Sequence, residues 1–251
     1  MASGRRYRKP PVVEALCEIY FVGSAWDDTV PGRFYDRVKD RFPVKRQREI
    51  QEAEVAFSAM GEAAARVRRL QPWMQFISEN RDRMIQLGRD LLVVNQLRPY
   101  PHFEDWEPVL YSALDICREL ARPQGIARIG VRYINKVVIP EPVVRMEDYF
   151  TIYPHLPSAM GDAHGAFMVR VELPSQKGGH TVLVTFGSAP ADAPEHIAHS
   201  LDLYDIFQPP QPVALDDVPK EVRTAHDNIV TAFEGSITER LRQLFEPGEE
   251  P

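Results

Sequence analysis

The chain has 251 residues, of which 44% are hydrophobic and 26% charged, an ordinary composition for a globular protein. No apolar run approaches the roughly 20 residues that span a bilayer. Glu14 and Glu18 interrupt the apolar stretch that follows the basic start, which argues against a secretory signal peptide. Two cysteines, Cys17 and Cys117, are too few for a disulfide framework and fit a reducing compartment. We therefore expect a cytoplasmic protein that does not enter a membrane.

Charge is spread unevenly along the sequence. Residues 1–125 carry 20 basic and 18 acidic side chains, a net charge of +2, whereas residues 126–251 carry 10 and 18, a net charge of −8. An acidic chain is a poor general nucleic-acid binder, because such binding rests on neutralising phosphates. A basic cluster near Trp73 and Phe76 could still hold a single strand by charge and stacking, but glutamates share the region, and solvated charged faces are the expectation. The cluster comprises Lys45, Arg46, Arg48, Arg66, Arg68 and Arg69.

The first half predicts a strand, a helix, a meander and a long helix. Apolar and polar residues alternate over Val13–Phe21, the pattern of a half-buried strand. Pro31 can begin a short helix that Pro43 ends. Apolar residues at helical spacing over Trp106–Leu120 predict an amphipathic helix of about 18 residues. Short strands are expected over Ala53–Phe57, Trp73–Ser78, Arg83–Leu87 and Leu91–Asn95.

The second half repeats this order. A strand is expected through ARIGVRYINKVVIP, residues 127–140, and a helical turn near Met146–Phe150. The glycines of SQKGG predict a hairpin between Phe167–Leu173 and Val182–Phe186. A loop over 188–198 leads to a strand over Leu201–Phe207. Asp216 and Asp217 can cap the next helix, and Ser236 to Glu239 reads as a capping box for a last helix.

These elements predict an α+β fold of antiparallel sheets. The shared order suggests two related β-α-β(3–4)-α halves, residues 12–125 and 126–251, which form a curved platform backed by helices and pack as one unit. Element order alone carries this interpretation, since no residue-level repeat accompanies it. Residues 1–11 are expected to form a disordered tail.

Three stretches carry a family resemblance. They are PPVVEALCEIYF (10–21), IARIGVRYINKVVIP (126–140) and HDNIVTAFEGSITERLRQLF (226–245). In this order and at this length they resemble a family of bacterial proteins described as sporadically distributed and uncharacterised. The resemblance implies genes that move between genomes, often beside mobile or defence functions, and it assigns no catalytic residues.

The best candidates for a ligand site are arginines on the central strand of the second half. Arg128 and Arg132 lie on the face opposite Ile129 and Val131, so that a buried guanidinium there would need a carboxylate or phosphate partner. Glu14 and Glu18 can supply it from the first strand. An internal Arg–Glu network is the favoured interpretation, and a site in which Arg128, Arg132 and Asn135 grip an anionic group is the alternative.

Three histidines are weaker candidates. His226 on the penultimate helix could act as a general base if a carboxylate orients it, although a packing role is the more common one. His196 and His199 have the spacing of a metal pair on a helix, but their segment reads as a loop that continues into a strand. We expect neither a metal nor a cofactor.

The sequence contains no phosphate-binding loop, dinucleotide fingerprint, zinc-protease motif or nucleophile elbow. The leading hypothesis is therefore an accessory or interaction protein that engages a protein partner. The alternatives are a sensor of a small anionic ligand and a metal-independent hydrolase or nuclease that uses His226.

Overall fold

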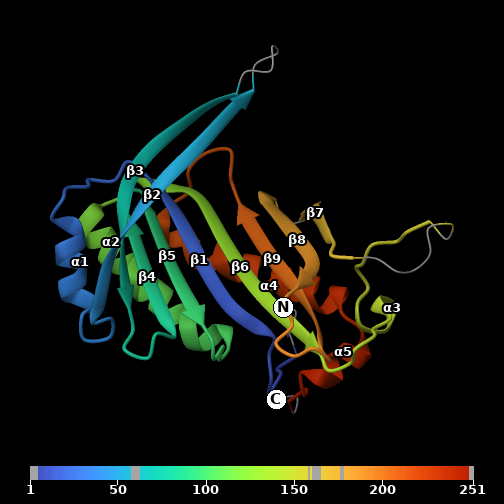
Figure 1. Cartoon of the computed structure of the whole chain (residues 1–251). Coiled ribbons are helices and arrows are strands. Elements are labelled where there is room, and N and C mark those ends of the chain that lie inside the picture. The colour runs from blue at the N-terminus through green and yellow to red at the C-terminus, as the bar shows by residue number, and fades with distance from the viewer. Residues whose placement is uncertain (1–4, 58–62, 158, 160–164, 176–177, 249–251) are drawn as a thin grey trace.

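One antiparallel sheet organises the chain (Figure 1). The computed structural model describes residues 5–57, 63–157, 159, 165–175 and 178–248, with the side chains of this set outside 49–72. The sheet has nine strands in the order β2-β3-β4-β5-β1-β6-β9-β8-β7. The strands are β1 (Val12–Val22), β2 (Val44–Phe57), β3 (Ala63–Ile77), β4 (Arg83–Gly88), β5 (Leu91–Leu97), β6 (Gly125–Ile139), β7 (Met168–Pro174), β8 (His180–Ala189) and β9 (Ile197–Phe207). The helices are α1 (Val30–Val38), α2 (Phe103–Ala121), α3 (Met146–Tyr149), α4 (Val218–Ser236) and α5 (Glu239–Leu244), with a 3-10 turn over Leu215–Asp217 before α4.

β1 and β6 pair at the centre of the sheet. Cys17 lies opposite Val131, and Glu18 lies opposite Gly130. On its other edge β1 pairs with β5, and β6 pairs with β9. Each central strand is thus flanked by the last strand of the meander that follows it in the chain, which joins both meanders into a single sheet.

Helices cover one face of this sheet. Ala15, Cys17 and Ile19 of β1 are fully buried on that face. Because successive side chains of a strand point to opposite faces, Glu14 and Glu18 lie on the other one. Figure 1 shows α1, α2 and α4 on the same side of the strands. We call the two sides the helix-covered face and the open face.

The two long helices bury apolar stripes against the sheet. Each has 19 residues. In α2 the stripe recurs every three or four residues and includes Trp106, Leu110 and Leu114, all at most 3% exposed. In α4 the corresponding stripe runs through Val218, Val222, Ala225 and Ile229.

The α+β class and the order of elements predicted from the sequence are confirmed, but two helix starts differ. Asp217 is the N-cap of α4, yet its side chain makes no capping hydrogen bond. The cap of α5 is Thr238, whose hydroxyl accepts a hydrogen bond from the Leu241 amide at 3.4 Å. Ser236 instead ends α4 and donates to a carbonyl one turn earlier. The predicted capping box is therefore wrong, because the last helix is capped by Thr238, two residues after Ser236.

Candidate functional site

A cavity of about 500 Å³ lies on the helix-covered face, where β6, β9, α4 and the start of α2 meet the N-terminal segment. Its inner end is buried, since Tyr133, Asn135 and Leu203 are at most 5% exposed. Its outer end includes the exposed side chains of Arg6 and Glu104. The volume falls within the range of about 300–1,000 Å³ that small-molecule sites occupy. Aromatic rings form much of the wall, from Tyr7, Tyr100, Phe103, Tyr133 and Phe233.

Three polar groups form a chain at the inner end of the cavity. The Tyr100 hydroxyl donates to the Tyr133 hydroxyl at 3.2 Å, and the Tyr133 hydroxyl lies 3.1 Å from Nδ1 of His226. The His226 imidazole stacks on the Phe103 ring with 4.1 Å between centroids, which fixes its plane. Strand β6, helix α4 and the segment after β5 therefore meet at one hydrogen-bonded point.

Burial keeps this chain neutral. It lowers the pKa of His226, because the charged imidazolium loses hydration, and Asp227 and Glu104 only partly oppose that effect. Burial raises the pKa of Tyr100 to about 12 and the pKa of Tyr133 well above its usual value. Because the Tyr133 hydroxyl accepts from Tyr100, its own proton is available to Nδ1, and we expect the imidazole proton on Nε2. His226 thus presents an N–H donor, with a phenol where the sequence-based hypothesis of a general base required a carboxylate.

Asn135 adds an acceptor at the same end. Its Nδ2 donates to the Leu201 carbonyl at 2.9 Å and lies 3.4 Å from the Tyr133 carbonyl. The amide nitrogen is therefore used by the backbone, and within the described chain the carbonyl oxygen Oδ1 is the group left to interact with cavity contents. Donor and acceptor functions thus occur together in an aromatic-walled space.

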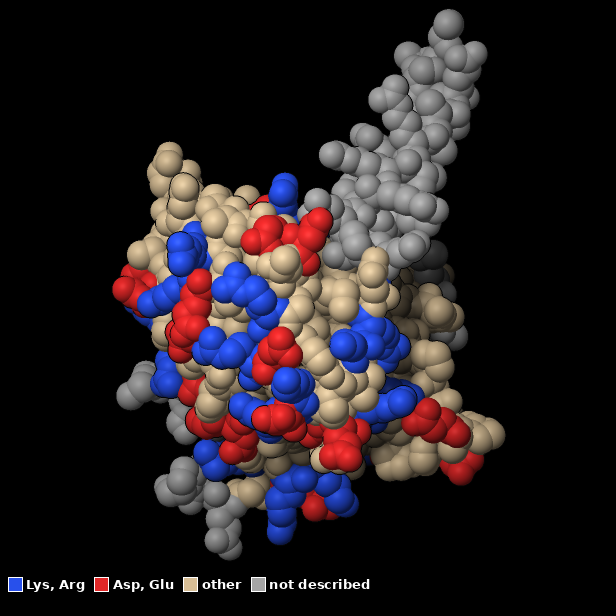
Figure 2. Space-filling model, turned by 90° about the vertical axis from the view of Figure 1, so that its left-hand side faces the viewer, with Lys and Arg blue, Asp and Glu red and all other residues tan. Residues whose placement is uncertain are grey.

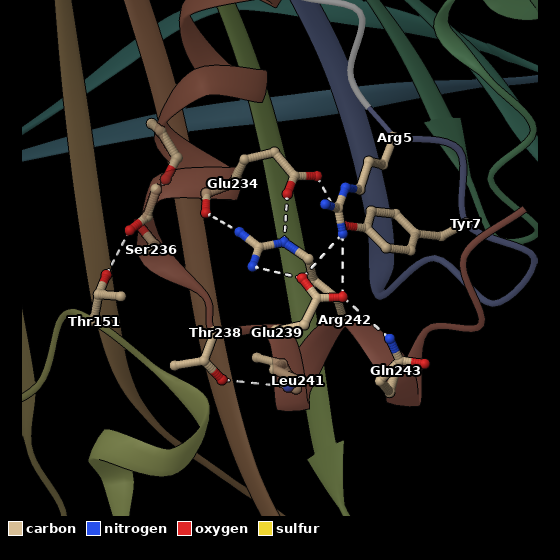
Figure 3. A network of polar contacts seen from close by, with 12 residues as sticks. Arg5, Tyr7, Thr151, Glu234, Ser236, Thr238, Glu239, Leu241, Arg242 and Gln243 are labelled. Atoms are coloured by element: carbon tan, nitrogen blue, oxygen red, sulfur yellow. Dashed lines mark hydrogen bonds and ion pairs between the residues drawn. The ribbon is translucent and has the colours of Figure 1, made fainter. Parts of the chain in front are cut away.

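The N-terminal segment forms one wall of the cavity, and a polar cluster fastens it to the C-terminal region (Figure 3). The Tyr7 hydroxyl donates to Glu234 at 2.8 Å, and Arg5 pairs with Glu239 at 3.0 Å. Arg242 holds Glu234 in turn, with Nε 2.8 Å from the carboxylate. Residues 5–11 are thus docked, and the expectation of a disordered tail is wrong for them.

The physical reason lies in Tyr7 and in the backbone beside it. Tyr7 is 9% exposed and packs edge-on against Phe233 and Phe245. Backbone amides of Arg8 and Lys9 donate to carbonyls near the C-terminus at 2.9 and 3.0 Å. One aromatic residue among four basic ones is too weak a pattern for the sequence to indicate this docking. Residues 1–4 of the expected tail lie outside the described residues.

The arginines singled out from the sequence lie on the open face, in an ion-pair network. Arg128 pairs with Glu18 at 3.2 Å, as expected, and both groups also contact the Tyr204 hydroxyl. Arg132 binds Asp202 through two contacts, at 2.8 and 2.5 Å. The expected partner Glu14 contributes only at longer range, by raising the pKa of Arg132 after the larger effect of Asp202.

Asn135 does not join these arginines. The pairing of β6 with β9 is regular from Ile129 to Ile139, so Asn135 and Arg132 point to opposite faces. The predicted set of Arg128, Arg132 and Asn135 is therefore divided between the open face and the cavity.

Gly130 makes room for the open-face network. A Cβ at this position would lie 2.6 Å from the Tyr204 hydroxyl and 2.8 Å from the Glu18 carboxylate. Only a residue without a side chain allows the tyrosine to cross β6 this closely.

A row of side-chain amides continues the polar network across the open face. Gln75 donates to Gln86 at 2.9 Å, Gln86 to Asn95 at 3.0 Å, and Asn95 to Glu14 at 2.6 Å. The three amides are at most 8% exposed. Sequence reasoning missed this row because its members come from four strands, and their only local signal is polar residues within otherwise apolar strands.

The histidine pair predicted as a weak metal candidate is separated by its surroundings. β9 begins at Ile197, so the expected loop over 188–198 is shorter than predicted. His199 is 3% exposed and lies among the rings of Phe150, Phe167 and Phe186, whereas His196 precedes the strand. Across the described ranges, no group of three or more His, Cys, Asp or Glu side chains could hold a metal.

A buried ionisable cluster that the sequence did not reveal lies between β8, β9 and α4. His180 Nδ1 lies 2.6 Å from Asp205, and Nε2 lies 3.0 Å from Glu221. Asn228 donates to the other Asp205 oxygen at 2.8 Å. Burial opposes the charged imidazolium, but the two carboxylates outweigh it and raise the pKa of His180. This cluster joins α4 to the sheet beside the cavity.

The surface over α1 and α2 carries both signs of charge (Figure 2). Ion pairs such as Arg37 with Glu119, 2.8 Å apart, bring opposite charges together.

In the predicted basic cluster, Phe76 is buried against Phe34, and Lys45 lies over the Tyr35 ring. The side chains of Arg66, Arg68 and Arg69 lie outside the described residues. Among the helices described, none combines the length and apolar character needed to cross a bilayer.

Comparison with known proteins adds no assignment. A scan of the chain against models of known protein families finds no match, and a search of curated proteins finds no matching relative.

Proposed function

We propose that the protein binds a small organic molecule in the cavity and acts as a ligand sensor. One observation carries this proposal: the neutral groups of Tyr133, His226 and Asn135 line the buried end of a 500 Å³ cavity. Small-molecule sites combine largely apolar walls with a few placed polar groups, and this cavity has that composition.

The cavity lining favours a planar, mostly apolar ligand. Such a ligand needs a hydrogen-bond acceptor for the His226 N–H and a donor for the Asn135 carbonyl. The outer end carries both signs, with Arg6 near Glu104 at 3.9 Å, so that charge alone selects no anion there. An anionic ligand held by Arg128 and Arg132 is the weaker alternative, because both guanidiniums already contact carboxylates.

The docked N-terminal segment gives binding a route to a response. Because residues such as Tyr7 line the cavity and are also fastened to α4 and α5, an occupant that displaces them would release part of the C-terminal surface. An accessory role toward a protein partner, the leading expectation from the sequence, then becomes the step after ligand binding. A hydrolase that uses His226 has less support, because its hydrogen-bond partner is a phenol.

The two-halves interpretation fits the position of the cavity. In one half β1 precedes the meander β2–β5 and α2, and in the other β6 precedes the meander β7–β9 and α4. The cavity takes residues from the end of the first unit, such as Tyr100 and Phe103, and from β6 and α4 of the second.

Thermal-shift screening with aromatic and heteroaromatic metabolites, followed by calorimetry of the hits, tests this proposal. His226→Phe keeps a ring on Phe103 but removes the donor, and it should weaken a genuine ligand about tenfold. Arg132→Gln on the open face is the matched control and should leave affinity unchanged. Ligands whose affinity is unchanged in His226→Phe but lost in Arg132→Gln would place the site on the open face instead.

A further inference from the structure

The sheet ends at β7 with an exposed edge. β7 is the last strand in the sheet order, so no strand of the described chain pairs with its outer edge. Met168, Val171 and Leu173 are 76%, 37% and 47% exposed. Natural sheets usually protect such an edge with charges, proline or a covering segment, because it offers unpaired backbone groups to another strand.

The pairing with β8 determines which backbone groups are free. Ser188 donates its amide to Phe167, and Ser175 donates to His180. In an antiparallel ladder the hydrogen-bonded pairs recur at every second residue. The amides and carbonyls of Val169, Val171 and Leu173 therefore point toward β8, and those of Met168, Arg170 and Glu172 point outward.

The side chains of β7 divide by the same period of two. Val169, Val171 and Leu173 lie opposite Phe186, Val184 and Val182, which are buried on the helix-covered face. These three extend the apolar core to the edge of the sheet, where Val171 and Leu173 are exposed. Arg170 and Glu172 project to the opposite side.

We propose that β7 pairs with β7 of a second copy of this chain, antiparallel about a two-fold axis at Val171. This register places Arg170 of each copy opposite Glu172 of the other, with Val169 opposite Leu173 and the two Val171 side chains together. The outward groups of Arg170 and Glu172 then form a hydrogen-bonded pair in each half of the ladder. Val171 falls at a non-hydrogen-bonded position, where side chains approach most closely.

The sequence MVRVELP therefore satisfies three requirements of self-pairing. The opposed charges are complementary, the opposed apolar residues match, and the outward backbone groups belong to the residues that form hydrogen-bonded pairs. Pro174, which has no N–H, falls at the end of the ladder opposite Met168, where only its carbonyl is needed. A strand pair of this length buries little area compared with a stable interface, so we expect a concentration-dependent dimer rather than a permanent one.

Sedimentation equilibrium of the full chain tests this dimer. Arg170→Glu and Glu172→Arg each put like charges opposite one another in both copies, and each should weaken dimerisation about tenfold or more. Both side chains are exposed and far from the core, and circular dichroism of each variant checks that the fold is unchanged. Val143→Glu, at a residue that is 80% exposed and outside β7, is the control and should dimerise like the unmodified chain.

Mixing the two charge variants gives the sharper result. In a heterodimer, the new glutamate at position 170 of one variant would face the new arginine at position 172 of the other. The unmodified Glu172 of the first variant would face the unmodified Arg170 of the second, so each opposed pair is again attractive. Equal mixing should therefore restore the dimer that each variant alone has lost.

Three results would overturn the proposal. The first is a chain that remains monomeric at all concentrations, whether or not β7 binds an extended peptide of another protein. The second is loss of the dimer in both charge variants without recovery on mixing. The third is a dimer that is insensitive to both variants.

Discussion

The Tyr133 hydroxyl lies 3.1 Å from Nδ1 of His226, and this contact joins the central strand of the sheet to the helix beside the cavity. It lies at the buried end of a hydrogen-bonded chain that begins at Tyr100. Tyr100 donates to the Tyr133 hydroxyl and burial keeps His226 neutral, so we expect the Tyr133 proton to be donated to Nδ1 and the chain to run in one direction. The site therefore offers a hydrogen-bond donor to whatever enters, without changing its own charge.

Tyr133→Phe should remove the hydroxyl that donates to His226 Nδ1 and so selects the tautomer of the imidazole. The expected cost is about 1 kcal/mol in the free energy of unfolding, because His226 Nδ1 loses its buried donor. Nitrogen-15 NMR of the imidazole should show one tautomer, with the proton on Nε2, in the unmodified protein and a mixture in the variant. A variant with the same tautomer as the unmodified protein would show that another group orients His226.

The His180 cluster should make stability depend on pH in two directions. The folded protein raises the pKa of His180 above its ordinary value, so its contribution is complete below about pH 6.5 and is lost as pH rises through the raised pKa. Burial favours the neutral form of Glu221, but hydrogen bonds to Lys220 and His180 outweigh it and lower the pKa of this carboxyl, whose contribution is lost as pH falls below about 4.5. Urea unfolding across this pH range should therefore show a maximum between the two limits.

His180→Leu leaves the Asp205 carboxylate, which is 0% exposed, without its cationic partner. Breaking a buried pair in this way costs about 3–5 kcal/mol, and the alkaline decline in stability should disappear with it. His155→Leu, at an exposed histidine in the loop after α3, is the control and should keep both features. An unchanged alkaline decline in His180→Leu would assign the titration to a different group.

Gly130→Ala should destabilise the protein by about 1–3 kcal/mol, because the new methyl group meets Tyr204 and Glu18 at less than 3 Å. The same substitution in a Tyr204→Ala background should cost clearly less, which a double-mutant cycle in urea measures. Gly32→Ala is a matched control, since its Cβ meets nothing within 4 Å and alanine favours a helix. Equal costs in both backgrounds would exclude Tyr204 as the reason for glycine at this position.

Tyr7→Ala should undock the N-terminal segment. The ring packs against Phe233 and Phe245, and its hydroxyl holds Glu234, so the variant loses both anchors. Limited trypsin digestion should then cut after Arg8 several times faster than in the unmodified chain, whereas Pro10 prevents cleavage after Lys9. Tyr7→Phe keeps the packing and should fall between them. Equal cleavage rates in all three proteins would mean that the ring does not hold the segment.

Much of the fold followed from the sequence because period-two and helical patterns identify strands and helices locally. The strand through Val13–Phe21 and the helix through Trp106–Leu120 are examples. The site did not follow in the same way. Tyr100 and Tyr133 become neighbours through the pairing of β1 with both β5 and β6, and His226 joins them through the packing of α4 on β6, which no local pattern encodes.

The second error in the site prediction concerned the strand face on which a side chain lies. Arg132 and Asn135 are three residues apart and therefore cannot share a strand face, and the strand assignment alone was enough to separate them. By contrast, the Arg128–Glu18 pair was predictable because both residues lie opposite the apolar set of their strands. Asp205 and His180 had no such signal, since each lies on the apolar face of its strand.

The most direct test of the cavity as a ligand site is an NMR titration of the His226 imidazole with the best hit from the metabolite screen. The proposal predicts a saturable shift of the Nε2–H signal, with a midpoint equal to the calorimetric dissociation constant, and no such response in Tyr204 or Arg132 on the open face. A hit that saturates the protein while His226 stays unchanged and the open-face signals move would contradict the proposal.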